Sequence, residues 1–501
     1  MLRYRSLPLE WLLCCLLCCG SAAAAPNDWA EGTTEKGGGA TRDYYNAAAQ
    51  LEWKNKMGDW RDARNTEQGG EAYAVAVVGK GQKDKFVEWD VTSLVKEWQN
   101  GTYPSQGFFL RLVKGKGAFD FASRESANAD QRPQLVLTGD KGHVTLAAQA
   151  DTFLEGGTHK SMGHLDYVRL STRPNHALVR FDLGGAKDIG NLRKAVLRLF
   201  CVKQTSDAEG TLGVFRCRQD HEVADKEPIF GLAAKYPGDK GIDKDPDVVF
   251  FSDFEPDRWD AVGWTVGPSY ELKTIAADAE RKFEPLQGKA LSAMLAKGES
   301  TALNLMFKFK NKLDAEPEEM YFRYYLRFGD DWNQTVQGGK MPGFSGTYNK
   351  AGWGGRKAHG DDGWSARGAY ALTIPADNPL GGRHPIGNYV YHADMTDNYG
   401  DIWLWTRGYR GFLEKNCWYC IEQQVKLNTP GKKDGELRGW VDGRLAFEKA
   451  DLRFRTVDKL KIEQVWMNIY HGGTLKSPYD QHVFIDNVVV ARKYIGPMMG
   501  R

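Results

Sequence analysis

The sequence predicts an all-β protein in which one or two N-terminal β-sandwich modules precede a C-terminal β jelly roll. Three observations support this fold class. The chain has 501 residues, of which 42% are hydrophobic, enough to bury substantial cores. Its 56 glycines and 12% aromatic residues fit turn-rich β structure better than a helical bundle. Apolar residues alternate, or nearly so, in runs such as Met320–Phe328, and glycine-rich turns separate these runs.

The charges of the chain nearly balance. Lys and Arg number 67 against 65 Asp and Glu, which gives a formal net charge of +2. Because neither sign is in excess, nothing indicates nucleic acid or an acidic lipid surface as a partner. The chain also lacks a GxGxxG segment before a helix, a Walker loop and an HExxH motif. We therefore expect no nucleic-acid partner, no cofactor and no metal site.

Residues 1–25 have the layout of an export signal. Arg3 and Arg5 precede an apolar run, and a run of small residues then offers a cleavage site to a signal peptidase. The apolar run is shorter than the roughly 20 residues of a membrane span. We expect a signal peptide over 1–25 and a secreted (periplasmic or extracellular), monomeric protein without a membrane span. A lipid anchor on Cys18 or Cys19 is the alternative.

Cleavage of the leader leaves four cysteines in an oxidising compartment, where disulfides form. Cys201 and Cys217 flank a predicted hairpin and could bridge it. Cys417 and Cys420 lie in a strand-like run, where positions i and i+3 face opposite sides, so a redox pair is the weaker interpretation. Neither pair has a partner at zinc-finger spacing. The pairing stays open at this point.

Two N-terminal segments contain short strand-like runs. Residues 28–140 resemble the later half of the DNRLRE-type carbohydrate-binding β-sandwich modules, with Phe121-Ala-Ser-Arg-Glu125 at the place of the name-giving motif. Residues 143–232, with Gln149-Ala-Asp-Thr-Phe-Leu154, resemble the opening half of the same module. The halves stand in reversed order, so one rearranged sandwich and two incomplete ones both fit. Spacers rich in β structure are the alternative.

A linker and a new domain follow. Residues 233–247 combine Gly, Pro and charge without apolar periodicity, which is typical of a linker. From 248 to 497, alternating runs such as Trp418–Leu427 and Val483–Val490 are separated by glycine-rich turns. This pattern predicts a jelly roll or sandwich over 248–497.

Five polar residues of this domain have a spacing that suits one common surface. Lys340 lies in a glycine-rich segment that is well placed to present an ammonium group in a cleft. Ser365 and Arg367 are two residues apart, as are Tyr389 and Tyr391, and in a strand each pair points to one face. An ordinary surface lysine and two half-buried aromatic rings are the plain alternatives.

The order of these residues resembles the active-site series of the polysaccharide lyase family 14 enzymes. That series has a Lys-hydrophobic-Pro-Gly segment, then a Ser-x-Arg strand, then a Tyr-x-Tyr strand, and this chain has all three at similar separations. Enzymes of the family cleave alginate- or glucuronan-type polyuronates by β-elimination. The resemblance implies an anionic polysaccharide as substrate and Lys340, Arg367, Tyr389 and Tyr391 as catalytic residues. It also implies that Ser365 orients the substrate.

This chemistry suits those residue types. A uronate C5 proton lies beside a carboxylate, so its removal needs a neutralised carboxylate, a base at C5 and an acid at O4. Arg367 can clamp the carboxylate, and Lys340 can act as base or add a charge. Tyr and Lys have pKa values of about 10 and 10.4, and proximity of two cations and a phenol would depress one of them. Whether Lys340 or a tyrosine is the base stays open.

Other residues flank the same segments. Gln337 and Arg356 are candidate substrate contacts by position alone. His392 follows the tyrosine pair and is also a candidate, although adjacent strand residues face opposite ways, which favours a packed neighbour. Four tryptophans could stack on sugar rings or pack in the core: Trp353, Trp364, Trp403 and Trp405. Three aspartates could bind calcium but lack the spacing of an EF-hand loop: Asp394, Asp397 and Asp401.

Two other functions remain in competition. A jelly-roll glycoside hydrolase needs two carboxylates roughly 5 to 10 Å apart, and Glu422 and Asp442 could form such a pair. A non-catalytic carbohydrate-binding protein is the second alternative. The sequence leaves the polymer, its linkage, and endo or exo action open.

Overall fold

The computed structural model describes residues 29–33, 38–186, 189–205, 207–217, 228–269 and 271–499. The predicted signal peptide lies outside them. The chain divides into two compact units. The N-terminal unit comprises Ala25–Glu222 with Pro375–Gly381, and the C-terminal unit comprises Val223–Ile374 with Gly382–Arg501. No helix among the described residues is long and apolar enough to cross a membrane.

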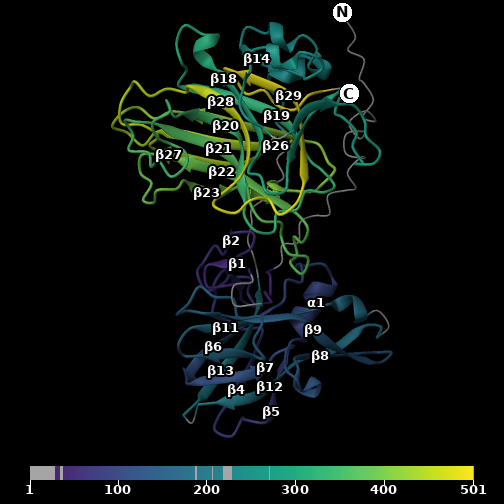
Figure 1. Ribbon diagram of the computed structural model, residues 1–501. Helices are drawn as coiled ribbons and strands as arrows, with labels where there is room; N and C mark the ends of the chain where they lie inside the picture. Colours follow the sequence, from purple (N-terminus) through teal and green to yellow (C-terminus); the bar gives the residue numbers. More distant parts are fainter. Residues whose placement is uncertain are drawn as a thin grey trace, which may run out of the picture. The chain divides into compact units, whose positions relative to one another are not determined.

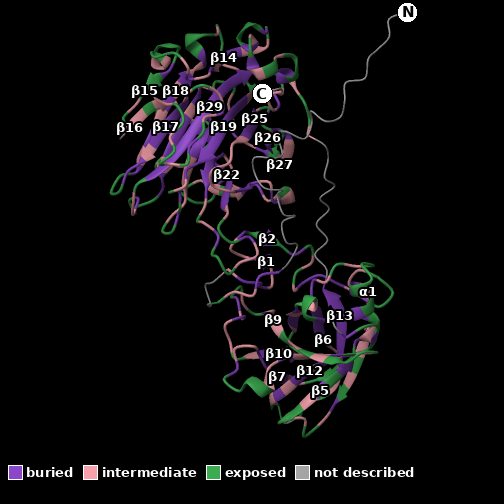
Figure 2. Ribbon diagram, turned by 90° about the vertical axis from the view of Figure 1, so that its right-hand side faces the viewer, coloured by how far each residue is buried: buried purple, intermediate pink, exposed green. Residues whose placement is uncertain are grey.

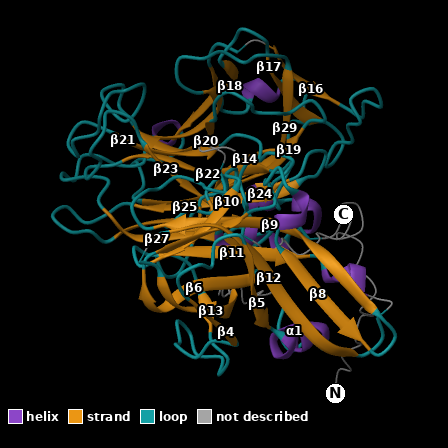
Figure 3. Ribbon diagram, turned by 90° about the horizontal axis from the view of Figure 1, so that it is seen from below, coloured by secondary structure: helices purple, strands orange, loops and turns teal. Residues whose placement is uncertain are grey.

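Both units are built from strands, as Figure 3 shows, and the predicted all-β class is confirmed. In the described part the exception is one α-helix, α1 (Thr92–Gln99), which buries Leu94, Val95 and Trp98 on one face. Short 3-10 helices connect some strands. They are η2 (Ala129–Gln131), η3 (Leu183–Ala186), η4 (Leu232–Lys235), η5 (Pro237–Asp239), η6 (Ile242–Lys244), η7 (Trp259–Ala261), η8 (Phe309–Asn311) and η9 (Arg407–Tyr409).

The N-terminal unit contains thirteen of the described strands: β1 (Tyr44–Asn46), β2 (Leu51–Glu52), β3 (Trp60–Arg61), β4 (Ala74–Val78), β5 (Lys85–Asp90), β6 (Phe108–Lys116), β7 (Ala118–Ala122), β8 (Gln134–Gly139), β9 (His143–Glu155), β10 (Tyr167–Ser171), β11 (Asn175–Phe181), β12 (Leu192–Gln204) and β13 (Glu209–Cys217). Eleven of them join in the order β10-β7-β12-β8-β9-β11-β6-β13-β3, with β4 on β13 and β5 on β12. Strands from before and after residue 140 are neighbours throughout this order, apart from β9 and β11, which both come after residue 140. The two predicted halves therefore form one interleaved β unit.

Period-two burial explains how this unit holds together. On β12 the alternate positions Ala195, Leu197, Leu199 and Cys201 are fully buried in a common apolar core. The residues between them are intermediate in exposure, because successive side chains of a strand point to opposite faces.

The predicted hairpin between Cys201 and Cys217 does not form, and the bridge that it could have carried is absent. Strand β12 pairs with β5, β7 and β8, whereas β13 pairs with β3, β4 and β6. Cys201 is a free, buried thiol, and burial raises its pKa to about 11. Cys420 is also free and buried, so it forms no disulfide with Cys417.

The C-terminal unit is a sandwich of two antiparallel sheets, each with eight described strands. The first, named here the β29 sheet, has the order β16-β17-β29-β19-β25-β26-β27 with β14 on β29. The second, the β20 sheet, has the order β15-β18-β28-β20-β21-β22-β23 with β24 on β22, and Figure 1 shows its middle strands side by side. The bounds are β14 (Val248–Ser252), β15 (Thr265–Val266), β16 (Glu271–Ile275), β17 (Ala290–Leu295), β18 (Thr301–Lys308), β19 (Glu319–Phe328), β20 (Gly339–Gly346), β21 (Trp364–Tyr370), β22 (His384–Tyr391), β23 (Asp401–Leu404), β24 (Phe412–Leu413), β25 (Tyr419–Lys426), β26 (Gly435–Val441), β27 (Arg444–Leu452), β28 (Gln464–His471) and β29 (Gln481–Ala491).

The core of the C-terminal unit lies between its two sheets, and Figure 2 shows the central strands β29, β19 and β22 as buried. The pairing register of strand β20 is irregular between Met341 and Gly343, where Pro342 lies. Proline has no N–H to donate, so a bulge at this position suits a central strand. The bulge lets Met341 and Phe344 both face the core, although they are three residues apart. The backbone N–H of Phe344 donates a hydrogen bond to the side-chain Oε1 of Gln423, at 3.3 Å.

Residues 233–247 are not an extended linker. The 3-10 helices η4, η5 and η6 pack here, and Leu232, Ala233 and Ile242 form a buried cluster with residues of β29. Asp239 and Arg323 of β19 are both buried and form an ion pair. Both oxygens of the Asp239 carboxylate accept hydrogen bonds from the guanidinium of Arg323. The apolar residues of this segment are too sparse to show a period, yet they suffice to fasten it to the C-terminal unit.

We expect Asp239→Ala to destabilise the C-terminal unit by about 3–5 kcal/mol, because it leaves the guanidinium of Arg323 buried without its counter-ion. Chemical unfolding followed by tryptophan fluorescence measures this loss. Asp243→Ala, at an exposed position of the same segment, is the control and should change stability by less than about 0.5 kcal/mol. The double variant with Arg323→Met should recover part of the loss. Equal stability of Asp239→Ala and the parent would contradict the assigned role.

Candidate functional site

The five predicted residues lie on three neighbouring strands of the β20 sheet. Lys340 is on β20, Ser365 and Arg367 are on β21, and Tyr389 and Tyr391 are on β22. Their strand neighbours, among them Met341, Ala366 and Val390, point into the sandwich core. The five side chains therefore share the opposite face, since side chains alternate along a strand. In the register, Arg367 stands opposite Tyr389, and Ser365 stands opposite Tyr391.

Lys340 is half-buried and faces aromatic rings. Its Nζ lies 4.5 Å from the ring centre of Tyr389 and 5.7 Å from that of Tyr470. A Cβ on Gly472 would lie 2.7 Å from this Nζ, so the glycine leaves room for the ammonium group. Burial, with the positive charge of Arg367 added, lowers the pKa of Lys340 to about 8. Near neutral pH this amine can therefore exist in both protonation states.

Arg367 is almost fully buried on the same face. Its guanidinium lies over the ring of Trp466, at 4.5 Å, and its Nη1 donates to Oδ1 of Asn468, at 3.1 Å. Its Nε is buried without a hydrogen-bond partner among the described residues. Burial lowers the pKa of Arg367 to about 10. Neither Arg367 nor Lys340 has a carboxylate ion-pair partner in the described part, so the two cations together form a site suited to an anion.

The two tyrosines are buried, but outside the sandwich core. Their rings meet edge to face at 5.5 Å and form a small separate cluster with Ala358, Ala369 and Met395. Two loops cover them: the Gly355 N–H donates to the Tyr391 hydroxyl and the Gly400 N–H to the Tyr389 hydroxyl, each at 3.1 Å. Burial, together with the hydrogen bond to Tyr391, raises the pKa of Tyr389 above its ordinary value. Tyr389 is thus held protonated.

Ser365 has a different place from the one the sequence implied. It is fully buried, and its hydroxyl donates to the Gly352 carbonyl at 2.7 Å. That bond anchors the loop whose Gly355 N–H contacts Tyr391. In this structure Ser365 positions the covering loop, and its hydroxyl is already engaged.

Two family models match the chain. Polysaccharide lyase 14 matches residues 287–488, the segment that carries all five residues of the site. The C-terminal unit contains this matched segment and is named here the lyase 14-like domain. A disaggregatase related repeat domain matches residues 40–137 of the N-terminal unit. That family is not clearly the DNRLRE-type module, so the carbohydrate-binding resemblance of these segments stays a prediction. No curated protein matches the chain.

Several solved structures resemble part of this chain. Alginate lyase Aly36B is 19% identical, with 51% of this chain and 99% of that chain covered and a TM-score of 0.37. The marine PL-14 alginate lyase from Aplysia kurodai is 16% identical, with 48% and 98% covered and a TM-score of 0.38. The endo-β-1,4-glucuronan lyase from the fungus Trichoderma reesei is 16% identical, with 49% and 95% covered and a TM-score of 0.34.

Three site residues of the lyase 14-like domain were missed in the sequence. Trp466, Asn468 and Tyr470 lie on β28, next to β20, and contact Arg367 or Lys340. A signal was present, because apolar residues alternate with these three along β28 and face the core. That alternation predicts a strand with one polar face, but it does not say that this strand pairs with β20.

The flanking candidates have contacts of their own. Arg356 is exposed and covers the ring of Trp353 at 4.1 Å, in the loop that contacts Tyr391. Gln337 is half-buried, and its Oε1 accepts a hydrogen bond from the Leu475 N–H at 3.3 Å. In the sequence His392 directly follows Tyr391, and its contacts are with Asp401 and Trp403. Its Nε2 lies 2.8 Å from Asp401, and its ring packs on Trp403 at 5.5 Å.

The tryptophans and aspartates that were candidates for sugar stacking and calcium have other contacts. Trp364 and Trp405 are buried in the core of the lyase 14-like domain, and Trp403 packs against that core. Asp394 pairs with Arg453 and Lys433, while Asp401 contacts His392. Asp394 and Asp401 thus contact different side chains.

The carboxylate pair of the hydrolase alternative is also engaged. Glu422 is buried on the outer face of the β29 sheet, where it accepts hydrogen bonds from the Ile495 and Gly496 N–H groups, each at 2.8 Å. Asp442 accepts from the Cys420 N–H at 2.8 Å. Burial raises the pKa of Glu422 to about 7. The C-terminal segment at Ile495 and Gly496 covers this carboxylate. The pair does not face the cations of the β20 sheet.

Proposed function

We propose that the lyase 14-like domain cleaves a uronate-containing polysaccharide, of the alginate or glucuronan type, by β-elimination. The observation that carries the proposal is the meeting of Lys340 and Arg367, both without a carboxylate partner among the described residues, beside the protonated phenol of Tyr389. A pair of cations needs an anionic occupant, and a uronate carboxylate supplies one. The family match over this segment agrees with the same activity.

The roles of the residues follow from their protonation. Arg367, through Nε and its remaining N–H groups, neutralises the substrate carboxylate and so acidifies the C5 proton. The neutral amine of Lys340 takes that proton. Electrons of the C5–H bond form the C4–C5 double bond while the C4–O4 bond breaks. The phenol of Tyr389 gives its proton to the leaving O4, and Tyr391 with the covering loops holds that phenol in place.

This assignment chooses between two alternatives that the sequence left open. Proximity of two cations was expected to favour either a deprotonated tyrosine or a neutral lysine. In the structure burial outweighs the attraction of Arg367, and the pKa of Tyr389 rises, which disfavours a phenolate base. The same burial favours the neutral form of Lys340. We therefore propose lysine as the base and tyrosine as the acid.

The direct test is a product screen of the purified full chain on alginate blocks, glucuronan and hyaluronan. Elimination leaves an unsaturated uronate that absorbs in the ultraviolet, whereas hydrolysis leaves reducing ends without this absorbance. Absorbance gain on at least one polymer supports the lyase. Reducing ends without absorbance would favour a hydrolase, and binding of a polymer without any product would favour a non-catalytic carbohydrate-binding protein.

The pH profile tests the role of Lys340. A base must be deprotonated, so kcat/KM should rise with pH and level off above the pKa of about 8. If Lys340 instead acted as a charged neutraliser, activity would fall as pH rises through the same region. Measurement of kcat/KM between pH 6 and 10, with a check that the fold persists across this range by circular dichroism, separates the two outcomes.

We also propose that the protein is exported and that its N-terminal unit binds the same polymer. Tethering of the polymer would raise the effective substrate concentration at the lyase 14-like domain. The export signal and the motifs of residues 121–125 and 149–154 support this part of the proposal.

A further inference from the structure

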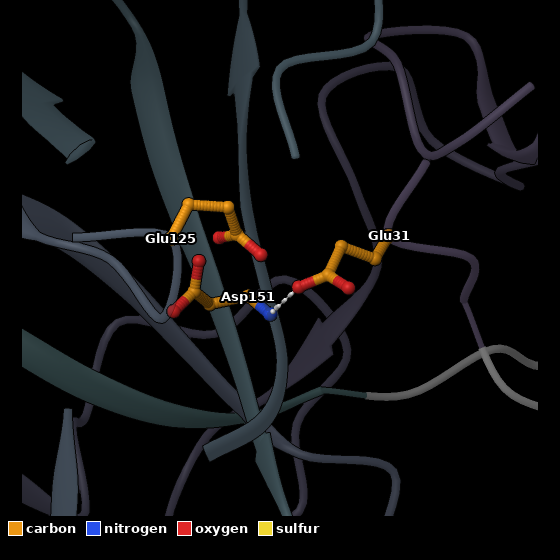
Figure 4. A group of neighbouring side chains, drawn as sticks. All are labelled: Glu31, Glu125 and Asp151. Carbon is orange, nitrogen blue, oxygen red and sulfur yellow. Dashed lines mark hydrogen bonds between the residues drawn. The ribbon is translucent and has the colours of Figure 1, made fainter. Parts of the chain in front are cut away.

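Three carboxylates meet in the N-terminal unit, far in sequence from the lyase 14-like domain. Glu31, Glu125 and Asp151 each offer an oxygen, and these oxygens lie within 4.8 Å of one another (Figure 4). Glu125 follows β7 and Asp151 lies on β9, so the cluster joins the two segments that stand in reversed order. Both residues belong to the motifs noted in the sequence, and the proposed elimination uses neither.

Two inner oxygens of this cluster have no donor in the part of the chain that the structure describes. Asp151 is 1% exposed, and its Oδ2 accepts from the Arg124 N–H at 2.7 Å. Its Oδ1 is buried without a hydrogen-bond partner, and so is Oε2 of Glu125. Figure 4 shows these two carboxylates turned toward each other, with Glu31 bound to the Asp151 N–H. A buried carboxylate oxygen without a donor or cation is strongly disfavoured.

One arginine contacts two of the three carboxylates. Arg124 contacts Glu31 at 3.0 Å and Glu125 at 3.2 Å, on oxygens other than the two without partners. Arg180 donates to the Trp29 carbonyl and Arg132 to the Ser126 carbonyl. The buried Oδ1 of Asp151 and Oε2 of Glu125 thus keep no hydrogen-bond partner among the described residues.

We propose that Glu31, Glu125 and Asp151 bind one calcium ion. Calcium takes buried carboxylate oxygens at about 2.3–2.6 Å, so two oxygens on one ion lie up to about 5 Å apart, as they do here. Zinc favours His and Cys ligands, which the cluster lacks. Magnesium keeps several waters, which suits a buried cluster poorly. The ion ties the stretch at Glu31 to β9 and to the loop after β7, so it closes the interleaved unit independently of lyase activity.

Calcium chloride titrated into the chelator-treated full chain is the primary experiment. Calorimetry should show one strong site, and calcium at about 100 times Kd should raise the melting temperature of the N-terminal unit by at least about 5 °C. Magnesium chloride at the same concentration should give a smaller shift. The proposal is overturned if the parent protein neither binds calcium nor changes its melting temperature between calcium and chelator.

Two conservative variants assign the site. Asp151→Asn and Glu125→Gln should each weaken calcium binding at least tenfold and remove most of the thermal shift. In chelator Asp151→Asn should melt at or above the parent, because one buried charge is gone, whereas in calcium the parent should melt higher. Misfolding does not give this crossing. Glu88→Gln, an exposed carboxylate paired with Arg198, is the control and should keep the full shift. A full shift in both site variants would place calcium elsewhere and overturn the assignment.

Discussion

The Lys340→Met variant is expected to lose about 10³-fold in kcat/KM on any polyuronate that the parent cleaves, since a positioned base contributes roughly 10²–10⁴-fold. Methionine keeps the unbranched shape of the side chain and removes the amine. Burial and the positive charge of Arg367 lower the pKa of this lysine to about 8, whereas the pKa of Arg367 stays at about 10 and that of Tyr389 is raised. Initial rates of absorbance gain measure the loss.

A second substitution separates the two roles of the same residue. Arginine keeps the positive charge but does not deprotonate near neutral pH. If Lys340 is the base, Lys340→Arg should be as inactive as Lys340→Met. If it only neutralises the carboxylate, Lys340→Arg should retain a measurable part of the activity and lose the pH dependence near 8.

The control for Lys340 is Lys350→Met, which places the same substitution at an exposed lysine of the following turn. It should retain parental rates. Circular dichroism and melting temperatures of all variants show whether a loss of activity reflects unfolding. Parental activity of folded Lys340→Met would refute the assigned role of this residue.

Removal of the Tyr389 hydroxyl is expected to have the second-largest effect. Tyr389→Phe should lower kcat by about 10²–10³-fold with little change in KM, because a general acid acts in the transition state. The ring and its contact with Lys340 remain in this variant, so packing changes little. The loss should be smaller on a substrate whose leaving group needs no proton, such as an aryl glycoside of a uronate.

Tyr391→Phe should cost less, about tenfold, because Tyr391 positions the Tyr389 phenol and accepts the Gly355 N–H. The double variant should be at most a few-fold slower than Tyr389→Phe, because the effects of substituting residues that act as a unit are not additive. Tyr236→Phe removes a phenol that is hydrogen-bonded to Asp245 outside the β20 sheet, and it serves as control. If Tyr391→Phe were the slower single variant, the acid would be Tyr391.

Much of the fold could be predicted, because burial acts on strands locally. Alternation of apolar residues identifies strands and their inward faces without knowledge of their partners, as β28 and β12 illustrate. The packed segment 233–247 was predicted as a linker because its buried residues are few and irregularly spaced. The Cys201–Cys217 hairpin failed for a related reason, since the partners of a strand depend on the whole sheet.

The spacing of residues two apart determined by itself that Ser365 joins Arg367, and Tyr389 joins Tyr391, on one face, because the pleat of a strand has a period of two. Only the tertiary structure decided that β28 borders β20, that Ser365 is sealed beneath a loop, and that Tyr389 stays protonated while Lys340 loses its proton readily. These features depend on burial and on long-range sheet order. Desolvation and strand pairing are set by residues distant in the chain, which no local pattern records.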